Sequence, residues 1–124
     1  MNKKKAWLYC RVAYEDYSAL EAQKRKLLAY ADQNGFETIG LSCDIGSGLT
    51  MDRPGWKEVE KAIDEEKAET VLAVNGSRIA RNIVELLNCA DWLNQRGVQL
   101  VTETDGEIKR LRVAVYMRLA RAED

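Results

Sequence analysis

Four arginines occupy positions where a charged side chain is costly unless it binds something. Arg11 closes an apolar stretch, Arg53 follows a glycine-containing loop, and Arg78 and Arg81 follow a predicted turn. A guanidinium group presents a planar fork of N–H donors that matches the oxygens of a phosphate. Arginines at the start of a predicted helix oppose its dipole by roughly 0.3–1 kcal/mol each. Together with free helix N-terminal amides, this pattern predicts a site for an oxyanion such as phosphate.

A structural interpretation of the same arginines stays open. Burying a charge without a partner costs several kcal/mol, so Arg11 is expected to pair with a carboxylate such as that of Asp44. In this interpretation Arg78 and Arg81 are solvated on the surface. Their spacing alone does not decide between a phosphate site and a structural role.

The sequence excludes several other kinds of site. It contains no histidine, which excludes a Ser-His-Asp triad, a Cys-His pair and histidine metal ligands. It has neither G-x-x-x-x-G-K-[ST] nor G-x-G-x-x-G, and no carboxylate cluster typical of a two-metal nuclease. The cysteines are too far apart in sequence for a zinc site or a disulfide framework: Cys10, Cys43 and Cys89. We therefore expect neither a metal nor another cofactor.

The composition is that of one ordinary globular domain. The 124 residues are 46% hydrophobic and 31% charged, and 19 Lys and Arg against 20 Asp and Glu give a net charge of -1. A nearly neutral chain binds anions only through a local cluster of basic residues. The apolar stretch from Ala6 to Cys10 ends at Arg11, too early for a signal peptide or a membrane span. We expect a cytoplasmic protein with no membrane partner.

Alternating strands and helices would bring the arginines together. Apolar stretches predict four buried strands, at residues 6–12, 36–43, 70–74 and 98–102. Helical spacing of apolar residues and capping signals predict helices at residues 17–34, 55–65, 78–96 and 109–122. This order predicts an α/β fold, a small doubly wound, mainly parallel four-stranded sheet with helices on both faces. Such sheets bind ligands outside the carboxyl ends of their strands, where all four arginines fall.

Short segments of the chain, in this order and spacing, resemble the catalytic domain of serine site-specific recombinases, the resolvase/invertase family. They lie between about Trp7 and Thr102: Tyr9-Cys10-Arg11-Val12, Leu20-Glu21-Ala22-Gln23, Asp44-Ile45-Gly46-Ser47-Gly48, Asp52-Arg53-Pro54-Gly55, Ser77-Arg78-Ile79-Ala80-Arg81-Asn82 and Gly97-Val98. The resemblance implies the resolvase catalytic-domain fold and a known chemistry. A serine hydroxyl attacks a DNA phosphate, a 5′-phosphoserine link forms, and the strands are exchanged by subunit rotation and rejoined. Arginines neutralise the phosphate, and no metal is needed.

The resemblance also implies roles for single residues. Arg11, Arg78 and Arg81 would bind the phosphate, and Arg53 would join them when DNA is bound. The other polar members of the site would be Gln23, Asp44, Ser47, Ser77 and Asn82.

Two departures from the family pattern concern the reaction itself. Ala13 stands at the position of the nucleophilic serine, and Ser77 stands where the family usually has an aspartate. A methyl group cannot form the covalent bond to phosphorus. Other nearby hydroxyls are expected to be structural: Ser18 in the cap region of the first helix, Ser77 as the cap of the third, and Ser47 on a loop. We expect that the chain does not cleave DNA itself.

The predicted domain organisation is a single unit. Residues 1–106 would form the α/β core, and residues 107–124 a truncated dimerisation helix with no helix-turn-helix domain after it. That helix is apolar on more than one face, so we expect a homo-oligomer or pairing with a full-length serine recombinase through Leu111, Val115 and Leu119. The alternative is that it packs on its own sheet. Without a DNA-reading domain, affinity for DNA is expected to be weak and strongly dependent on salt.

Three functions stay open from the sequence. The first is a degenerate recombinase domain, from a bacterium or mobile element, that regulates or pairs with an active recombinase. The second is a fragment of an active recombinase that carries an engineered Ser-to-Ala change at Ala13. The third is an arginine-lined phosphate or nucleotide binder unrelated to recombination.

Overall fold

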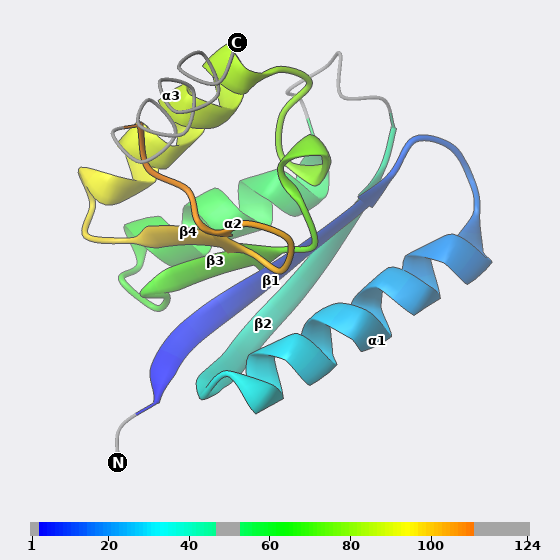
Figure 1. Ribbon diagram of the computed structural model, residues 1–124, viewed down its shortest axis with the longest axis horizontal. Coiled ribbons are helices and arrows are strands. Elements are labelled where there is room, and N and C mark those ends of the chain that lie inside the picture. Colours follow the sequence, from blue (N-terminus) through cyan, green and yellow to red (C-terminus); the bar gives the residue numbers. More distant parts are fainter. Residues whose placement is uncertain (1–2, 47–52, 111–124) are drawn as a thin grey trace, which may run out of the picture.

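The computed structural model describes residues 3–46 and 53–110 and has a five-stranded sheet at its centre (Figure 1). The strand order is β2-β1-β3-β4-β5. β1 to β4 pair in parallel, and β5 pairs antiparallel with β4. The strands are β1 (Lys4–Val12), β2 (Phe36–Ile45), β3 (Thr70–Ala73), β4 (Gln99–Thr102) and β5 (Gly106–Glu107). The predicted α/β fold with its mainly parallel sheet is confirmed.

The short strand β5 is the one described strand that the sequence pattern did not predict. It has two residues, too few for any periodicity. It forms because the chain reverses after β4 through a turn that leads into Gly106, whose φ of 71° lies in the left-handed region that glycine adopts without strain. The predicted four-stranded sheet therefore has a fifth, antiparallel edge strand.

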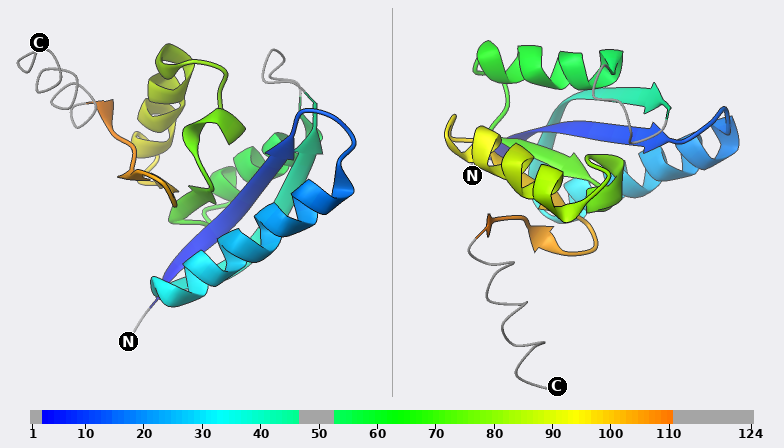
Figure 2. Two further views of the ribbon diagram at one scale, coloured as in Figure 1. Left: turned by 45° about the vertical axis from the view of Figure 1, so that its right-hand side comes forward. Right: turned by 90° about the horizontal axis from the view of Figure 1, so that it is seen from above.

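Three described helices cover the two faces of the sheet: α1 (Tyr17–Gln33), α2 (Pro54–Asp64) and α3 (Ile83–Asn94). α1 and α2 lie on opposite sides of β1 and β2 (Figure 2). The alternation along β1 explains this, because Leu8 and Cys10 pack with residues of α1 while Tyr9 packs with residues of α2 and α3. A parallel sheet covered on both faces needs such continuously apolar strands.

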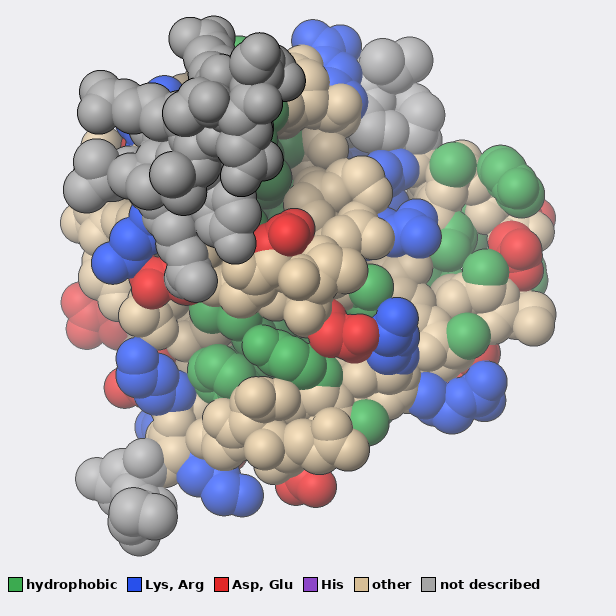
Figure 3. Space-filling model, in the orientation of Figure 1, with side chains coloured by type: hydrophobic (Ala, Val, Ile, Leu, Met, Phe, Trp, Pro, Cys, Tyr) green, Lys and Arg blue, Asp and Glu red, His purple; other side chains and the backbone are tan. Residues whose placement is uncertain are grey.

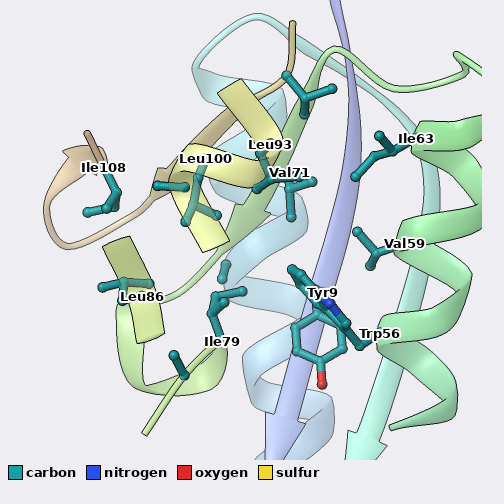
Figure 4. Close-up of a cluster of buried hydrophobic side chains, with 14 residues drawn as sticks. Tyr9, Trp56, Val59, Ile63, Val71, Ile79, Leu86, Leu93, Leu100 and Ile108 are labelled. Carbon is teal, nitrogen blue, oxygen red and sulfur yellow. The ribbon is translucent and has the colours of Figure 1, made fainter. Parts of the chain in front are cut away.

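The larger of the two cores fills the space between the sheet, α2 and α3 (Figure 4). The ring of Tyr9 meets the indole of Trp56 edge-on, with 5.1 Å between the ring centroids. Val59, Leu93 and Leu100 are fully buried around them. Each such side chain contributes roughly 1.5–3 kcal/mol through removal from water, so this core fixes the position of α2 against β1.

The ends of α1 follow local capping rules. The side chain of Asp16 accepts a hydrogen bond from the Ala19 amide at 2.9 Å, so Asp16 is the N-cap and Ser18 lies inside the first turn. At the other end Gly35 has a φ of 75°, the left-handed conformation that commonly follows the last turn of a helix.

The third helix begins later than predicted. Gly76–Arg78 forms a short 3₁₀ turn, η1, and α3 starts only at Ile83. Asn82 is its N-cap and accepts from the Glu85 amide at 2.9 Å. Arg81 directly precedes this cap, as expected, whereas Arg78 lies in η1. The prediction that Ser77 caps this helix is wrong.

Some predictions fall outside the described residues. They concern Ser47 in the loop after β2, and the C-terminal helix with its expected interface residues Leu111, Val115 and Leu119. Among the helices of the described ranges, none is both long and apolar enough to cross a membrane.

We predict that Asn82→Ala lowers the free energy of unfolding by about 1 kcal/mol, because the first turn of α3 loses its side-chain acceptor. Urea denaturation followed by circular dichroism measures this change. Asn82→Asp keeps an acceptor at the cap and should retain the stability of the unmodified chain. Equal stability of the alanine variant would contradict the capping role.

Candidate functional site

Arg11, at the end of β1, reaches across the carboxyl edge of the sheet toward η1. Its guanidinium donates to the carbonyl oxygen of Ser77 at 2.6 Å, to that of Arg78 at 3.2 Å, and to that of Gly46. The guanidinium of Arg78 in turn donates to the carbonyl oxygen of Arg11 at 3.2 Å. The two arginines therefore hold the ends of β1 and η1 together through each other's backbone.

Arg53 joins this group from the residue before α2. Its guanidinium donates to the carbonyl oxygen of Arg78 at 3.3 Å, to that of Ile79, and to the hydroxyl of Tyr9 at 3.1 Å. It also lies 5.7 Å from the centroid of the Tyr9 ring. Three of the four predicted arginines thus meet at the sheet edge where ligands of such folds bind. We call Arg11, Arg53 and Arg78 the arginine cluster.

The arginine cluster is buried and carries positive charge. Arg11 is 7% exposed and Arg53 is 3% exposed. Burial, reinforced by the charge of Arg53, lowers the pKa of Arg11, although an arginine remains protonated at neutral pH. Within the described part of the chain, neither Arg11 nor Arg78 forms an ion pair. Carbonyl dipoles satisfy the N–H groups of Arg11 and Arg78 without cancelling their charge, so these two guanidinium groups can attract an anion.

Asp44 does not neutralise Arg11, although the two residues are opposite each other in the register of β1 and β2. Its carboxylate accepts instead from the Tyr9 hydroxyl at 2.7 Å and from the amides of Gly55 and Trp56 at 2.8 and 2.9 Å. The expected pairing of Arg11 with Asp44 is therefore not formed. Asp44 caps α2 from a neighbouring strand and reaches Arg53 through the phenol of Tyr9.

The close packing of this cap requires a glycine at position 55. A Cβ atom on Gly55 would lie 2.5 Å from the carbonyl oxygen of Cys43 and 2.9 Å from an oxygen of Asp44. Burial of the phenol, and then its hydrogen bond to Asp44, raise the pKa of Tyr9. Tyr9 is therefore a neutral hydroxyl that donates to the carboxylate and accepts from Arg53.

Gln23 fixes the backbone at the end of β1. Its side-chain carbonyl accepts from the Arg11 amide at 2.9 Å, and its amide donates to the Arg11 carbonyl at 3.1 Å. Ala13 follows two residues later and is exposed. The residue at the predicted nucleophile position is thus accessible beside a rigid strand end.

Two predicted site residues lie apart from the arginine cluster. Arg81 is 48% exposed and pairs with Glu85 at 2.8 Å. The side-chain oxygen of Asn82 is used by the cap of α3. The prediction that Arg78 and Arg81 form one anion site with helix amides does not describe this structure, because Arg81 turns along α3.

Ser77 contributes its backbone rather than its hydroxyl. Its carbonyl oxygen accepts a hydrogen bond from the guanidinium of Arg11, whereas its hydroxyl donates to the side chain of Asn75 at 2.6 Å. Asn75 also accepts from the Ser77 amide at 3.1 Å, which shapes η1. The hydroxyl is engaged in this turn.

Sequence reasoning missed Tyr9, Trp56 and Asn75 as residues that build the site. A signal was present for Tyr9, because it precedes Arg11 by two residues and so shares its face of β1. Asn75 followed by Gly76 is likewise typical of a turn. Nothing in the sequence indicated that the amide of Trp56 would bind a carboxylate from β2.

The arrangement is suited to holding an oxyanion with several oxygens. Preorganised guanidinium groups stabilise negative charge without needing to reorganise. In residues 3–46 and 53–110, no group of three or more His, Cys, Asp or Glu side chains is placed to hold a metal ion.

We predict that Asp44→Asn destabilises the fold by about 1–3 kcal/mol, because an amide leaves one buried N–H of α2 without an acceptor. The midpoint of urea unfolding reports the change. Glu58→Gln, an exposed neutralisation on the same helix, is the matched control and should change stability by less than about 0.5 kcal/mol. Equal losses in both variants would contradict the capping role of Asp44.

Comparison with known proteins agrees with this geometry. A resolvase-family site-specific recombinase from Streptococcus pneumoniae is 28% identical, with a TM-score of 0.76 over 98% of this chain and 88% of that one. The catalytic domain of ISC1926 TnpA, an IS607-like serine recombinase, is 27% identical, with a TM-score of 0.73 over 79% of this chain and 69% of that one. The N-terminal catalytic domain of TP901-1 integrase shares the fold at 21% identity, with a TM-score of 0.79 over 96% of this chain and 93% of that one.

The family described as "Resolvase, N terminal domain" matches residues 6–123, nearly the whole chain. The two catalytic domains and the pneumococcal recombinase match over most of their own lengths as well. The chain belongs to the resolvase N-terminal domain family, the catalytic domain of the serine recombinases that carry out site-specific DNA recombination.

Proposed function

We propose that this chain binds a DNA phosphate in its arginine cluster and takes part in recombination without cleaving DNA. The observation that carries the proposal is the convergence of Arg11, Arg53 and Arg78 at the carboxyl edge of the sheet. Arg11 is almost fully buried, and yet its guanidinium donates only to backbone carbonyl oxygens among the described residues. A cluster kept at this electrostatic cost is best explained by an anionic ligand.

Ala13 supports the second half of the proposal. It is exposed two residues beyond Arg11, where the family pattern has its nucleophilic serine. Among the described residues, the hydroxyl of Ser77 is bound to Asn75 and Ser18 lies within the first turn of α1, so neither takes the place of a nucleophile. Phosphoryl transfer depends on positioning and charge stabilisation, but a covalent step still needs an attacking atom.

The remaining predicted residues take supporting roles in this proposal. Gln23 and Asp44 position the backbone around the cluster rather than touch the phosphate. Arg81 would add a contact to DNA only after leaving Glu85. Asn82 holds the start of α3.

The proposed partners of this chain are those expected of its family, namely DNA and another recombinase chain. Residues 1–106 would act as the core and residues 107–124 as a dimerisation segment that pairs with a second copy or with a full-length serine recombinase. The nearly neutral net charge of -1 predicts weak binding to DNA by the chain alone. Lys, Arg, Asp and Glu side chains also alternate over the face seen in Figure 3 rather than forming one basic surface.

A second candidate is a recombinase domain that lacks only its nucleophile. The hydrogen bonds that join Arg11, Gln23 and Arg78 favour this possibility, because they hold the strand end that leads to the exposed Ala13.

We predict that the unmodified chain forms no covalent link to DNA and that Ala13→Ser restores one, because the hydroxyl returns beside the arginine cluster. A denaturing gel with labelled duplex, followed by mass spectrometry of the phosphoserine peptide, detects the link. Ala29→Ser, the same change on the exposed side of α1, is the control and should stay unlinked. A link formed by the unmodified chain would contradict the proposed inactivity.

We also predict that Arg78→Ala weakens binding to duplex DNA at low salt and reduces the slope of log affinity against log salt by about 1, as expected for one lost phosphate contact. Fluorescence anisotropy with a labelled duplex measures both. Arg25→Ala, on the exposed face of α1, should leave the slope unchanged. Tight binding of a free nucleotide with no binding of DNA would instead favour a phosphate binder unrelated to recombination.

A further inference from the structure

A pocket of about 320 Å³ lies between α2 and α3. Two tryptophans, two glutamates, an asparagine and a cysteine line it: Trp56, Glu60, Glu85, Asn88, Cys89 and Trp92. Burial raises the pKa of Cys89 to about 12, so at neutral pH its thiol adds no charge. The lining residues therefore carry a negative formal charge from the two glutamates, and the two tryptophans add aromatic surface.

One oxygen of Glu85 has no hydrogen-bond partner. Its Oε1 pairs with Arg81 at 2.8 Å, whereas Oε2 is buried and accepts nothing. A buried carboxylate oxygen without a donor is rare in native proteins and costs free energy. Glu60, on the facing helix, forms no ion pair within residues 3–46 and 53–110. Glu60 and Glu85 both line the pocket, so their negative charges would attract a cation that enters it.

The same helix already binds guanidinium groups in two ways. The guanidinium of Arg96 lies over the ring of Trp92 at 4.0 Å from its centroid. Arg110 donates to the side chains of Asn88 and Asp91 at 3.0 and 2.9 Å. Indoles attract cations through the negative face of the ring, and carboxylates bind the N–H fork of a guanidinium. These contacts show which ligand chemistry the surface of α3 accepts.

We propose that the pocket between α2 and α3 binds an alkylguanidinium or alkylammonium cation, the group shared by arginine and lysine side chains and by polyamines. The cationic head would donate to the carboxylates of Glu85 and Glu60, and the aliphatic stem would lie against Trp56 and Trp92. The ligand is either a free small cation or a basic side chain of a second copy of this chain. The proposal does not rest on DNA binding, so the titration below tests it separately from the proposed function.

The test is a titration of the full chain with agmatine, spermidine and the neutral analogue butylurea, followed by tryptophan fluorescence. Agmatine and spermidine are expected to bind with dissociation constants on the order of 1 mM, and butylurea not at all. Glu85→Gln keeps the shape of the pocket and should weaken binding of agmatine about tenfold, since it removes the charge that faces the ligand. Glu65→Gln is the matched control, because Glu65 pairs with Lys67 outside the pocket.

A second variant tests whether weaker binding of agmatine could result from misfolding. Trp92→Leu should also weaken binding of agmatine while its circular dichroism stays that of the unmodified chain. Equal binding of butylurea, or unchanged binding by Glu85→Gln, would overturn the proposal, because the pocket would then be only an apolar slot.

Sedimentation separates the two sources of the cation. Self-association that agmatine competes away identifies a side chain of a second copy, and self-association that it leaves unchanged identifies a free cation.

Discussion

The electrostatic cost of burying guanidinium groups is the constraint on which this domain depends. Arg11 and Arg53 are nearly inaccessible, and their N–H groups donate to carbonyl oxygens of Gly46, Ser77, Arg78 and Ile79. Most of these oxygens are positioned by the tight turn of η1, which Asn75 caps. This edge of the fold is therefore arranged around buried guanidinium groups, and such groups attract anions.

A chain of hydrogen bonds links this edge to the packing of the core. The carboxylate of Asp44 accepts from the first amides of α2 and from the hydroxyl of Tyr9. This hydroxyl accepts in turn from the guanidinium of Arg53. Tyr9 is at the same time the aromatic partner of Trp56 in the larger core. A change in core packing would therefore move Arg53, and the rigidity of the cluster is a product of the same contacts that stabilise the domain.

The sequence predicted the order of the main elements well because each follows from a local pattern. The four parallel strands are apolar and the two long helices have clear faces, so strand and helix positions agree within a few residues. The start of α3 could not be read in the same way, because both Asn75 and Asn82 can cap a helix and only tertiary packing selects Asn82. The same limit applies to Asp44, whose partners lie on α2 rather than on the neighbouring arginine. Spacing placed Arg11, Arg53 and Arg78 at one edge, but the direction of Arg81 depends on a side-chain ion pair that spacing does not show.

That ion pair connects the two sites. Glu85 divides its carboxylate between Arg81, which the family pattern assigns to the phosphate, and the pocket between α2 and α3. A cation bound by Glu85 would weaken the attraction that holds Arg81 and would make this arginine available to DNA. An exposed pair of this kind contributes no more than about 1 kcal/mol, so a ligand of modest affinity is sufficient to shift it. In the proposed function, a cation bound in the pocket between α2 and α3 would therefore raise the affinity of the chain for DNA.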